Sequence, residues 1–125
     1  MLIIIGLAGS GKTTYFQENL SDKYELYDDF ISNLFDIEKI NEKMCLIDPR
    51  LCDYEIFKEI MIEIEKYIDR SKIKIILFEN NPERCLINSQ NRSKKNVDKM
   101  INIYSRKYDL EKYKNYDYEI IKVYE

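Results

Sequence analysis

The chain has 125 residues, a formal net charge of −3 at pH 7 and a hydrophobic content of 45%. This length suits one domain, residues 1–125, and leaves no room for a second. The chain has no histidine, which excludes histidine general bases and histidine-activated nucleophiles, so we expect any proton acceptor to be a carboxylate.

No apolar run approaches the ~20 residues of a membrane span, and the apolar start lacks the charged residues and cleavage site of a signal peptide. We therefore expect a cytoplasmic protein with no membrane partner, and no stable protein partner is evident. The three cysteines Cys45, Cys52 and Cys85 form no C-x-x-C pair. Without histidine they predict no zinc site, and buried small hydrophobic side chains are their expected role.

The first predicted strand, Leu2–Ile5, leads directly into Gly6-Leu7-Ala8-Gly9-Ser10-Gly11-Lys12-Thr13. This is the phosphate-binding pattern G-x-x-x-x-G-K-[ST], in the strand–loop–helix context that it needs. We expect the loop from Gly6 through Ala8, Gly9 and Ser10 to Gly11 to bind phosphate through its amides. Lys12 supplies charge to the outer phosphates, and the Thr13 hydroxyl can bind Mg²⁺. A glycine-rich turn without a ligand is the alternative interpretation.

Strand and helix patterns alternate after this motif. A helix is expected from Lys12 to about Leu20, a strand over residues 24–27, a helix from Phe30 to Ile40 and a strand over residues 44–47. Asp53 can cap the next helix, whose apolar stripe is Ile56, Phe57, Ile60, Ile64, Tyr67 and Ile68.

The second half of the chain continues the alternation. Residues 73–78 predict an inner strand, Asn81-Pro82 a helix start, residues 90–95 a loop, Val97 to Tyr108 a helix and residues 118–124 an edge strand. The fold class is therefore α/β: a five-stranded, parallel, doubly wound sheet of expected order 2-3-1-4-5, with helices on both faces. Ligands bind such sheets at the carboxyl ends of the strands, where Gly6, Asp28, Asp48 and Glu79 fall.

Two aspartates that follow strands are candidates for chemistry. Asp28 can accept a proton from a substrate hydroxyl or orient it, whereas Asp29 is expected to cap the following helix. Asp48 can support Mg²⁺ through water, or serve only as a turn residue before Pro49.

A basic segment over residues 84–107 holds seven basic residues and one acidic residue. Its charge of +6 leaves −9 for the rest of a chain whose total is −3. Arg92 in this segment is the preferred phosphate-binding arginine, and Arg84 and Arg50 are weaker candidates. We expect residues 84–96 to act as a lid, with a solvated helix face as the alternative. In the stretch Tyr113-Lys114-Asn115-Tyr116, packing at an edge is preferred over base stacking.

The order and spacing of five segments resemble the small P-loop kinases around the polynucleotide 5′-kinase domain, including zeta-toxin-type kinases. These segments are the phosphate loop, Asp28-Asp29-Phe30, Ile47-Asp48, the helix to Asn88 and Arg92, and residues 97–104. The resemblance covers nearly the whole chain, but only the phosphate loop is sharply specific. It implies a P-loop NTPase fold, with Asp28 as general base, Arg92 as the lid arginine on the phosphates and Thr14 touching the α-phosphate.

This resemblance predicts an enzyme: an ATP- and Mg²⁺-dependent kinase that transfers the γ-phosphoryl group to a small nucleoside-like or nucleic-acid 5′-hydroxyl acceptor. Where polynucleotide kinases carry two arginines near the base, this chain has Tyr27 and Ile31, which argues against a nucleic-acid end. The alternatives are a nucleotide-binding switch or NTPase without an acceptor, and a degenerate kinase that serves as a binding module.

Overall fold

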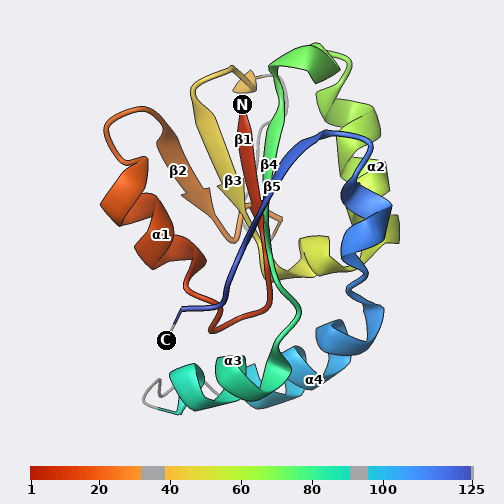
Figure 1. Ribbon diagram of the computed structural model, residues 1–125. Coiled ribbons are helices and arrows are strands. Elements are labelled where there is room, and N and C mark those ends of the chain that lie inside the picture. Colours follow the sequence, from red (N-terminus) through yellow and green to blue (C-terminus); the bar gives the residue numbers. More distant parts are fainter. Residues whose placement is uncertain (32–38, 91–95, 125) are drawn as a thin grey trace.

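A five-stranded parallel sheet forms the centre of the computed structural model, which describes residues 1–31, 39–90 and 96–124 (Figure 1). The strands are β1 (Leu2–Ile5), β2 (Glu25–Asp28), β3 (Met44–Ile47), β4 (Lys74–Phe78) and β5 (Asp117–Ile121). Their order is β2-β3-β1-β4-β5, and every neighbouring pair is parallel. The predicted parallel sheet and its strand order are confirmed.

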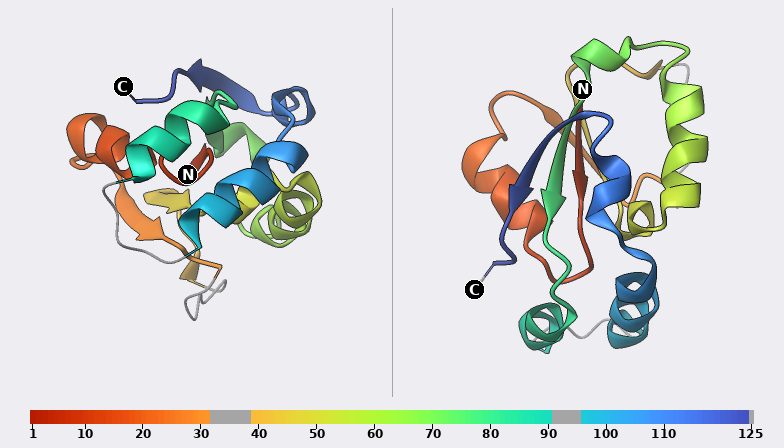
Figure 2. Two further views of the ribbon diagram at one scale, coloured as in Figure 1. Left: turned by 90° about the horizontal axis from the view of Figure 1, so that it is seen from below. Right: turned by 45° about the vertical axis from the view of Figure 1, so that its right-hand side comes forward.

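Helices cover both faces of the sheet and its carboxyl end. They are α1 (Lys12–Asn19), α2 (Tyr54–Ile64), α3 (Pro82–Ser89) and α4 (Val97–Lys107), with short 3₁₀ helices η2 (Pro49–Cys52), η3 (Arg70–Lys72) and η4 (Leu110–Tyr113). Figure 1 and the right-hand view of Figure 2 place α1 on one face and α2 on the other. In both views α3 and α4 lie across the end of the sheet where the strands finish.

The strand β1 explains why the sheet needs helices on both faces. All four of its residues are buried, and successive side chains of a strand point to opposite faces. Ile3 and Ile5 pack in the larger core, which includes Phe57 of α2. Leu2 and Ile4 pack in a second cluster with Phe16 of α1. A continuous apolar run is the pattern expected for a parallel strand covered on both faces.

The helix α2 begins as predicted but ends earlier than its apolar stripe suggested. The Asp53 carboxylate accepts from the Glu55 amide and caps the helix, as predicted. The prediction that Tyr67 belongs to the buried stripe is wrong, because its side chain is 52% exposed. The Tyr67 amide bonds the carbonyl of Ile64, three residues back. This turn is tighter than an α-helix, and it directs Tyr67 to solvent while Ile68 stays buried.

Aromatic and cysteine side chains fill the core in the predicted manner. Tyr113 is fully buried, its hydroxyl donates to the Leu51 carbonyl, and its ring centroid lies 4.8 Å from that of Phe57. Packing is therefore the role of this tyrosine. Cys45, Cys52 and Cys85 are free and buried, as predicted.

Some predictions fall outside the described residues. Most of the helix expected from Phe30 to Ile40 lies in 32–38, and most of the loop expected over 90–95, including Arg92, lies in 91–95. Among the helices in the described part of the chain, none combines the length and apolar content needed to cross a membrane.

Candidate functional site

The glycine loop connects the buried strand β1 to the start of α1. It takes a tight turn in which the Ser10 amide donates to the Leu7 carbonyl at 3.1 Å. Gly9 and Gly11 have φ values of 80° and 98°, a region that residues with a side chain rarely adopt. The loop therefore ends at the N-terminus of α1, where the first amides have no partner within the helix. Such a terminus favours an anion.

Lys12 lies beneath this loop. Its Nζ donates to the carbonyls of Gly6 and Leu7, both at 2.8 Å, and the residue is only 7% exposed. An ammonium has three donors, so two carbonyls leave one for an anion. Burial lowers the pKa of Lys12, because the charged form loses its water. A bound anion would offset that cost.

A carboxylate reaches the other side of the loop from the end of β2. The hydroxyl of Thr13 donates to Oδ2 of Asp28 at 3.3 Å. Asp28 pairs with Ile47 in the sheet, and the Asp29 amide donates to the Ile47 carbonyl at 2.8 Å. The sheet register therefore positions Asp28 beside the glycine loop.

These residues line one cavity of about 170 Å³. Its walls come from the loop and α1, from the turn after β2, and from apolar residues of η2 and α4; the lining residues are Ala8, Gly9, Gly11, Lys12, Thr13, Asp28, Asp29, Pro49, Val97 and Met100. We refer to it as the front cavity. It holds a cation, two carboxylates and a hydroxyl within an otherwise partly apolar wall.

The front cavity has the oxygen donors that suit Mg²⁺. The described residues contain no group of three or more histidine, cysteine or acidic side chains that could hold a metal. Mg²⁺ does not require one, because it usually takes one or two protein oxygens and completes its shell with phosphate and water. The Thr13 hydroxyl and the neighbouring Asp28 carboxylate fit that donor set.

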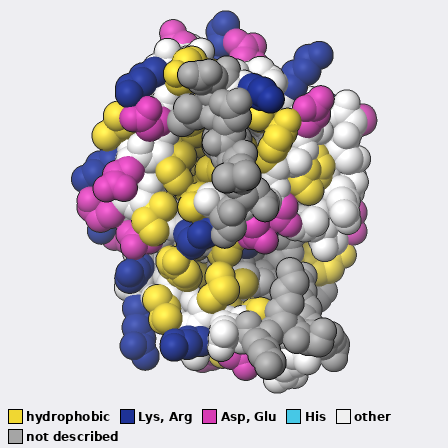
Figure 3. Space-filling model, turned by 180° about the vertical axis from the view of Figure 1, so that it is seen from behind, with side chains coloured by type: hydrophobic (Ala, Val, Ile, Leu, Met, Phe, Trp, Pro, Cys, Tyr) yellow, Lys and Arg dark blue, Asp and Glu magenta, His cyan; other side chains and the backbone are white. Residues whose placement is uncertain are grey.

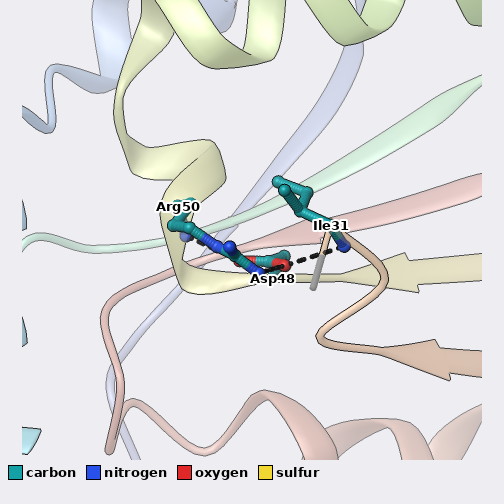
Figure 4. A network of polar contacts seen from close by, with 3 residues as sticks. All are labelled: Ile31, Asp48 and Arg50. Atoms are coloured by element: carbon teal, nitrogen blue, oxygen red, sulfur yellow. Dashed lines mark hydrogen bonds and ion pairs between the residues drawn. The ribbon is translucent and has the colours of Figure 1, made fainter. Parts of the chain in front are cut away.

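Asp48, the other predicted magnesium residue, is hydrogen-bonded to Ile31 and Arg50 (Figure 4). It is fully buried, and each of its two oxygens accepts two hydrogen bonds. Oδ1 accepts from the backbone amide and Nε of Arg50, and Oδ2 accepts from the Ile31 amide and Nη2 of Arg50. A carboxylate has about four acceptor sites, so these bonds use all of them. This geometry favours the turn role over the metal role: Asp48 joins the end of β3 to the segment that follows Asp28-Asp29.

A second cavity of about 320 Å³ lies on the other side of the loop, and we call it the rear cavity. It is lined by Gly9, Gly11, Thr14, Arg84, Ile87, Asn88 and Tyr124. The Nε of Arg84 is buried and has no hydrogen-bond partner among the residues that the structure describes. A buried guanidinium donor without a partner is costly, and an anion in this cavity would satisfy it.

The helix α4 places basic side chains near the same end of the sheet. Lys99, Arg106 and Lys107 are exposed, and Figure 3 shows Lys and Arg side chains along the lower left edge of the molecule. Lys107 Nζ lies 3.3 Å from Oδ2 of Asp53, so part of this charge is paired within the protein. The behaviour of residues 84–96 as a lid stays a prediction.

The structure brings Lys12, Thr13 and Asp28 into one cavity, as the sequence predicted. Thr14 faces the rear cavity instead, and Gly9 and Gly11 border both cavities. The sequence ranked Arg84 below Arg92 and gave no role to Asn88 or Tyr124. A signal existed for Arg84 and Asn88, since both lie on one face of the helix that starts at Asn81-Pro82.

Comparison with known proteins places the chain beside a viral relative. No protein-family model matches it. The chain is 40% identical over 133 aligned residues to the uncharacterized protein R277 of Acanthamoeba polyphaga mimivirus. The alignment covers 99% of this chain and 96% of that protein. At this identity and coverage, the chain belongs to the same family as the mimivirus protein R277.

Proposed function

We propose that this protein is a P-loop kinase that transfers the γ-phosphoryl group of ATP to a hydroxyl group, with Mg²⁺ as cofactor. The observation that carries the proposal is the front cavity, where a complete phosphate loop, the buried Lys12 and the Asp28 carboxylate meet. A glycine-rich turn without a ligand would not need a buried ammonium, because burying that charge costs free energy.

Each residue has a separate task in the proposed reaction. The loop amides and Lys12 bind the phosphates. Thr13 would hold Mg²⁺, which would neutralise charge on the phosphoryl group as it is transferred. Asp28 accepts the proton of the acceptor hydroxyl. The oxygen of that hydroxyl forms the new bond to the γ-phosphorus, and the bond between this phosphorus and the ADP oxygen breaks. Pro49, Val97 and Met100 line the front cavity with apolar surface, which would limit the water around the reacting group.

The rear cavity suits the rest of the donor nucleotide. It shares Gly9 and Gly11 with the front cavity, so a chain of phosphates over the loop can extend from one to the other. The Nε of Arg84, which has no hydrogen-bond partner in the described part of the chain, would bind a phosphate oxygen. A charge-assisted bond of this kind is about twice as strong as a neutral one. The lid arginine Arg92 remains part of the proposal.

The acceptor is proposed to be a small nucleoside-like molecule, with a nucleic-acid 5′-hydroxyl as the other member of the class. Two carboxylates, Asp28 and Asp29, border the front cavity. They would repel the phosphates that accompany a nucleic-acid end, since like charges destabilise one another at close range. We place the reaction in the cytoplasm, where ATP is available.

Two measurements test the proposal. Calorimetry should detect ATP binding in the presence of Mg²⁺, and absence of binding at millimolar ATP would overturn the central claim. Labelled ATP should then be offered with nucleosides, nucleotides, 5′-hydroxyl oligonucleotides and sugars, with the Lys12→Met variant as the control for contaminating kinases. Transfer of label to an acceptor supports a kinase, whereas hydrolysis without transfer would favour an NTPase.

A further inference from the structure

The outer side of the phosphate loop is held by two segments that are far away in the sequence. Asn88 of α3 donates from Nδ2 to the carbonyl of Gly9 at 3.0 Å and to the carbonyl of Tyr124 at 2.6 Å. The Tyr124 amide in turn donates to the carbonyl of Ser10 at 3.0 Å. One side-chain amide therefore ties the loop to α3 and to the segment after β5.

The loop has no room to move toward either segment. A Cβ added to Gly9 would lie 2.5 Å from the carbonyl oxygen of Cys85 in α3. A Cβ added to Gly11 would lie 2.5 Å from the Cβ of Tyr124. Real Cβ atoms do not approach so closely, so the absence of side chains at these two glycines is what lets α3 and residues 122–124 form the outer wall of the loop.

Both supports are themselves anchored. Asn81 caps α3 by accepting from the Arg84 amide, which fixes the start of the helix and so sets where Asn88 lies, about two turns further along. The segment after β5 is bonded to the sheet, because the Val123 amide donates to Oε1 of Glu79 at 3.2 Å. Asn88 thus connects the loop to rigid parts of the fold.

The orientation of the loop carbonyls decides where its amides point. In a planar trans peptide the N–H is directed opposite to the preceding carbonyl. Because the Ser10 carbonyl faces the Tyr124 amide, the Gly11 amide is directed away from that segment, to the side where a phosphate would lie. Holding the Ser10 carbonyl outward keeps the Gly11 amide ready for an anion before the anion arrives, which lowers the cost of binding. Holding the Gly9 carbonyl outward keeps the Ser10 amide on the Leu7 carbonyl and so preserves the turn of the loop.

We propose that Asn88 is a positioning residue that holds the phosphate loop in its binding conformation by joining it to α3 and residues 122–124. This proposal rests on the proposed function, since it concerns nucleotide affinity at the same loop. Both N–H donors of the carboxamide are used in the contacts, so the hydrogen bonds, and not the volume of the side chain, are the essential feature.

The first experiment measures affinity for Mg²⁺–ATP and turnover in two variants. Asn88→Ala removes both hydrogen bonds, and we expect the Kd to rise by about 10-fold while kcat at saturating ATP changes by less than about 3-fold. Asn88→Asp keeps the volume but directs an oxygen at two carbonyls, so it should weaken binding at least as much as Asn88→Ala. Asn102→Ala, which alters an exposed asparagine of α4, is the matched control. Affinity retained by Asn88→Asp would overturn the proposal.

The second experiment does not depend on nucleotide. Hydrogen exchange of the free protein should be faster at the amides of Ser10 and Tyr124 in Asn88→Ala, with the amides of β1 unchanged. Unchanged exchange at Ser10 and Tyr124 would overturn the positioning role even if affinity falls. If the wild-type protein binds no ATP, the proposed function fails, and exchange still decides whether Asn88 holds the loop. Should Asn88→Ala not fold, Asn88→Ser, which is too short to reach both carbonyls, replaces it in both experiments.

Discussion

The two cavities beside the phosphate loop share two glycines but differ in charge. The front cavity combines Lys12 with Asp28 and Asp29, whereas the described residues that line the rear cavity include the guanidinium of Arg84 and no carboxylate. A polyanion is favoured in the rear cavity and over the loop, and a neutral hydroxyl beside a proton acceptor is favoured in the front cavity. Charge therefore separates the donor end of the proposed reaction from the acceptor end.

The largest effect should come from Lys12, whose buried ammonium lies under the loop and lines the front cavity, where the proposed transfer takes place. Lys12→Met should abolish turnover, while the free energy of unfolding stays within about 1 kcal/mol of the wild type or increases, because burial disfavours the charge of Lys12. Turnover with labelled ATP and urea unfolding measure the two quantities. Lys23→Met, at an exposed lysine, is the control, and residual turnover in Lys12→Met would contradict the role of this residue.

The acceptor end is tested at its two carboxylates. Asp28→Asn should lower kcat by about 100-fold or more, with ATP affinity nearly unchanged, as expected for loss of a general base. Asp29→Asn changes the neighbouring carboxylate of the same cavity and should have a small effect on kcat. Its φ of 50° is one that asparagine tolerates, so stability should also be kept. Steady-state kinetics of both variants distinguish them, and a reversed outcome would make Asp29 the base.

A change in the rear cavity, the proposed donor end, should affect ATP affinity more than kcat. Arg84→Ala should raise the Kd for ATP by about 10-fold, with a smaller change in kcat, because a charge-assisted bond is lost on the nucleotide and not at the reacting hydroxyl. Calorimetry measures the affinity. Arg106→Ala, at an exposed arginine of α4, should change nothing, and equal affinity in Arg84→Ala and wild type would remove Arg84 from the site.

The smallest effect lies in the sheet, away from both cavities. Burial raises the pKa of Cys45 from 9.0 to about 12. The thiol stays protonated in the folded chain above pH 9 but ionises in the unfolded chain, so its contribution to stability is complete below pH 9 and is lost as pH rises toward 12.

Cys45→Ala should therefore lose less stability between pH 8 and pH 10 than the wild type, by about 1 kcal/mol. Urea unfolding at both pH values measures this, and ATP affinity at pH 8 should not change. Parallel pH dependence of the free energy of unfolding in the two proteins would mean that burial does not raise the pKa of the Cys45 thiol.

Several parts of the site could be predicted because their signals are local. The phosphate loop is a continuous sequence motif after an apolar strand. Asp28 could be placed at the same edge because carboxyl ends of parallel strands lie together. The end of α2 could not be predicted in the same way, since Tyr67 continues the apolar period and only the tighter turn at Ile64 exposes it.

The preference for Arg92 over Arg84 could not be settled from the sequence. A basic residue in a polar stretch and one on a helix look equally available when only their spacing is known. What distinguishes Arg84 is that its Nε is buried beside Gly9 and Thr14, which depends on how α3 crosses the end of the sheet. The role of Arg92 stays a prediction, because this residue lies outside the described residues.

The sequence by itself determined the alternation of strands and helices, the phosphate loop and the side of the sheet on which Asp28 lies, because these depend on neighbouring residues and on the period of the apolar pattern. Only the tertiary structure decided that Asp48 uses all of its acceptors on Arg50 and Ile31, and that Asn88 joins Gly9 to Tyr124. Asn88 and Gly9 are 79 residues apart. A hydrogen bond over such a separation forms only after the strands and α3 have packed, so no local pattern carries it.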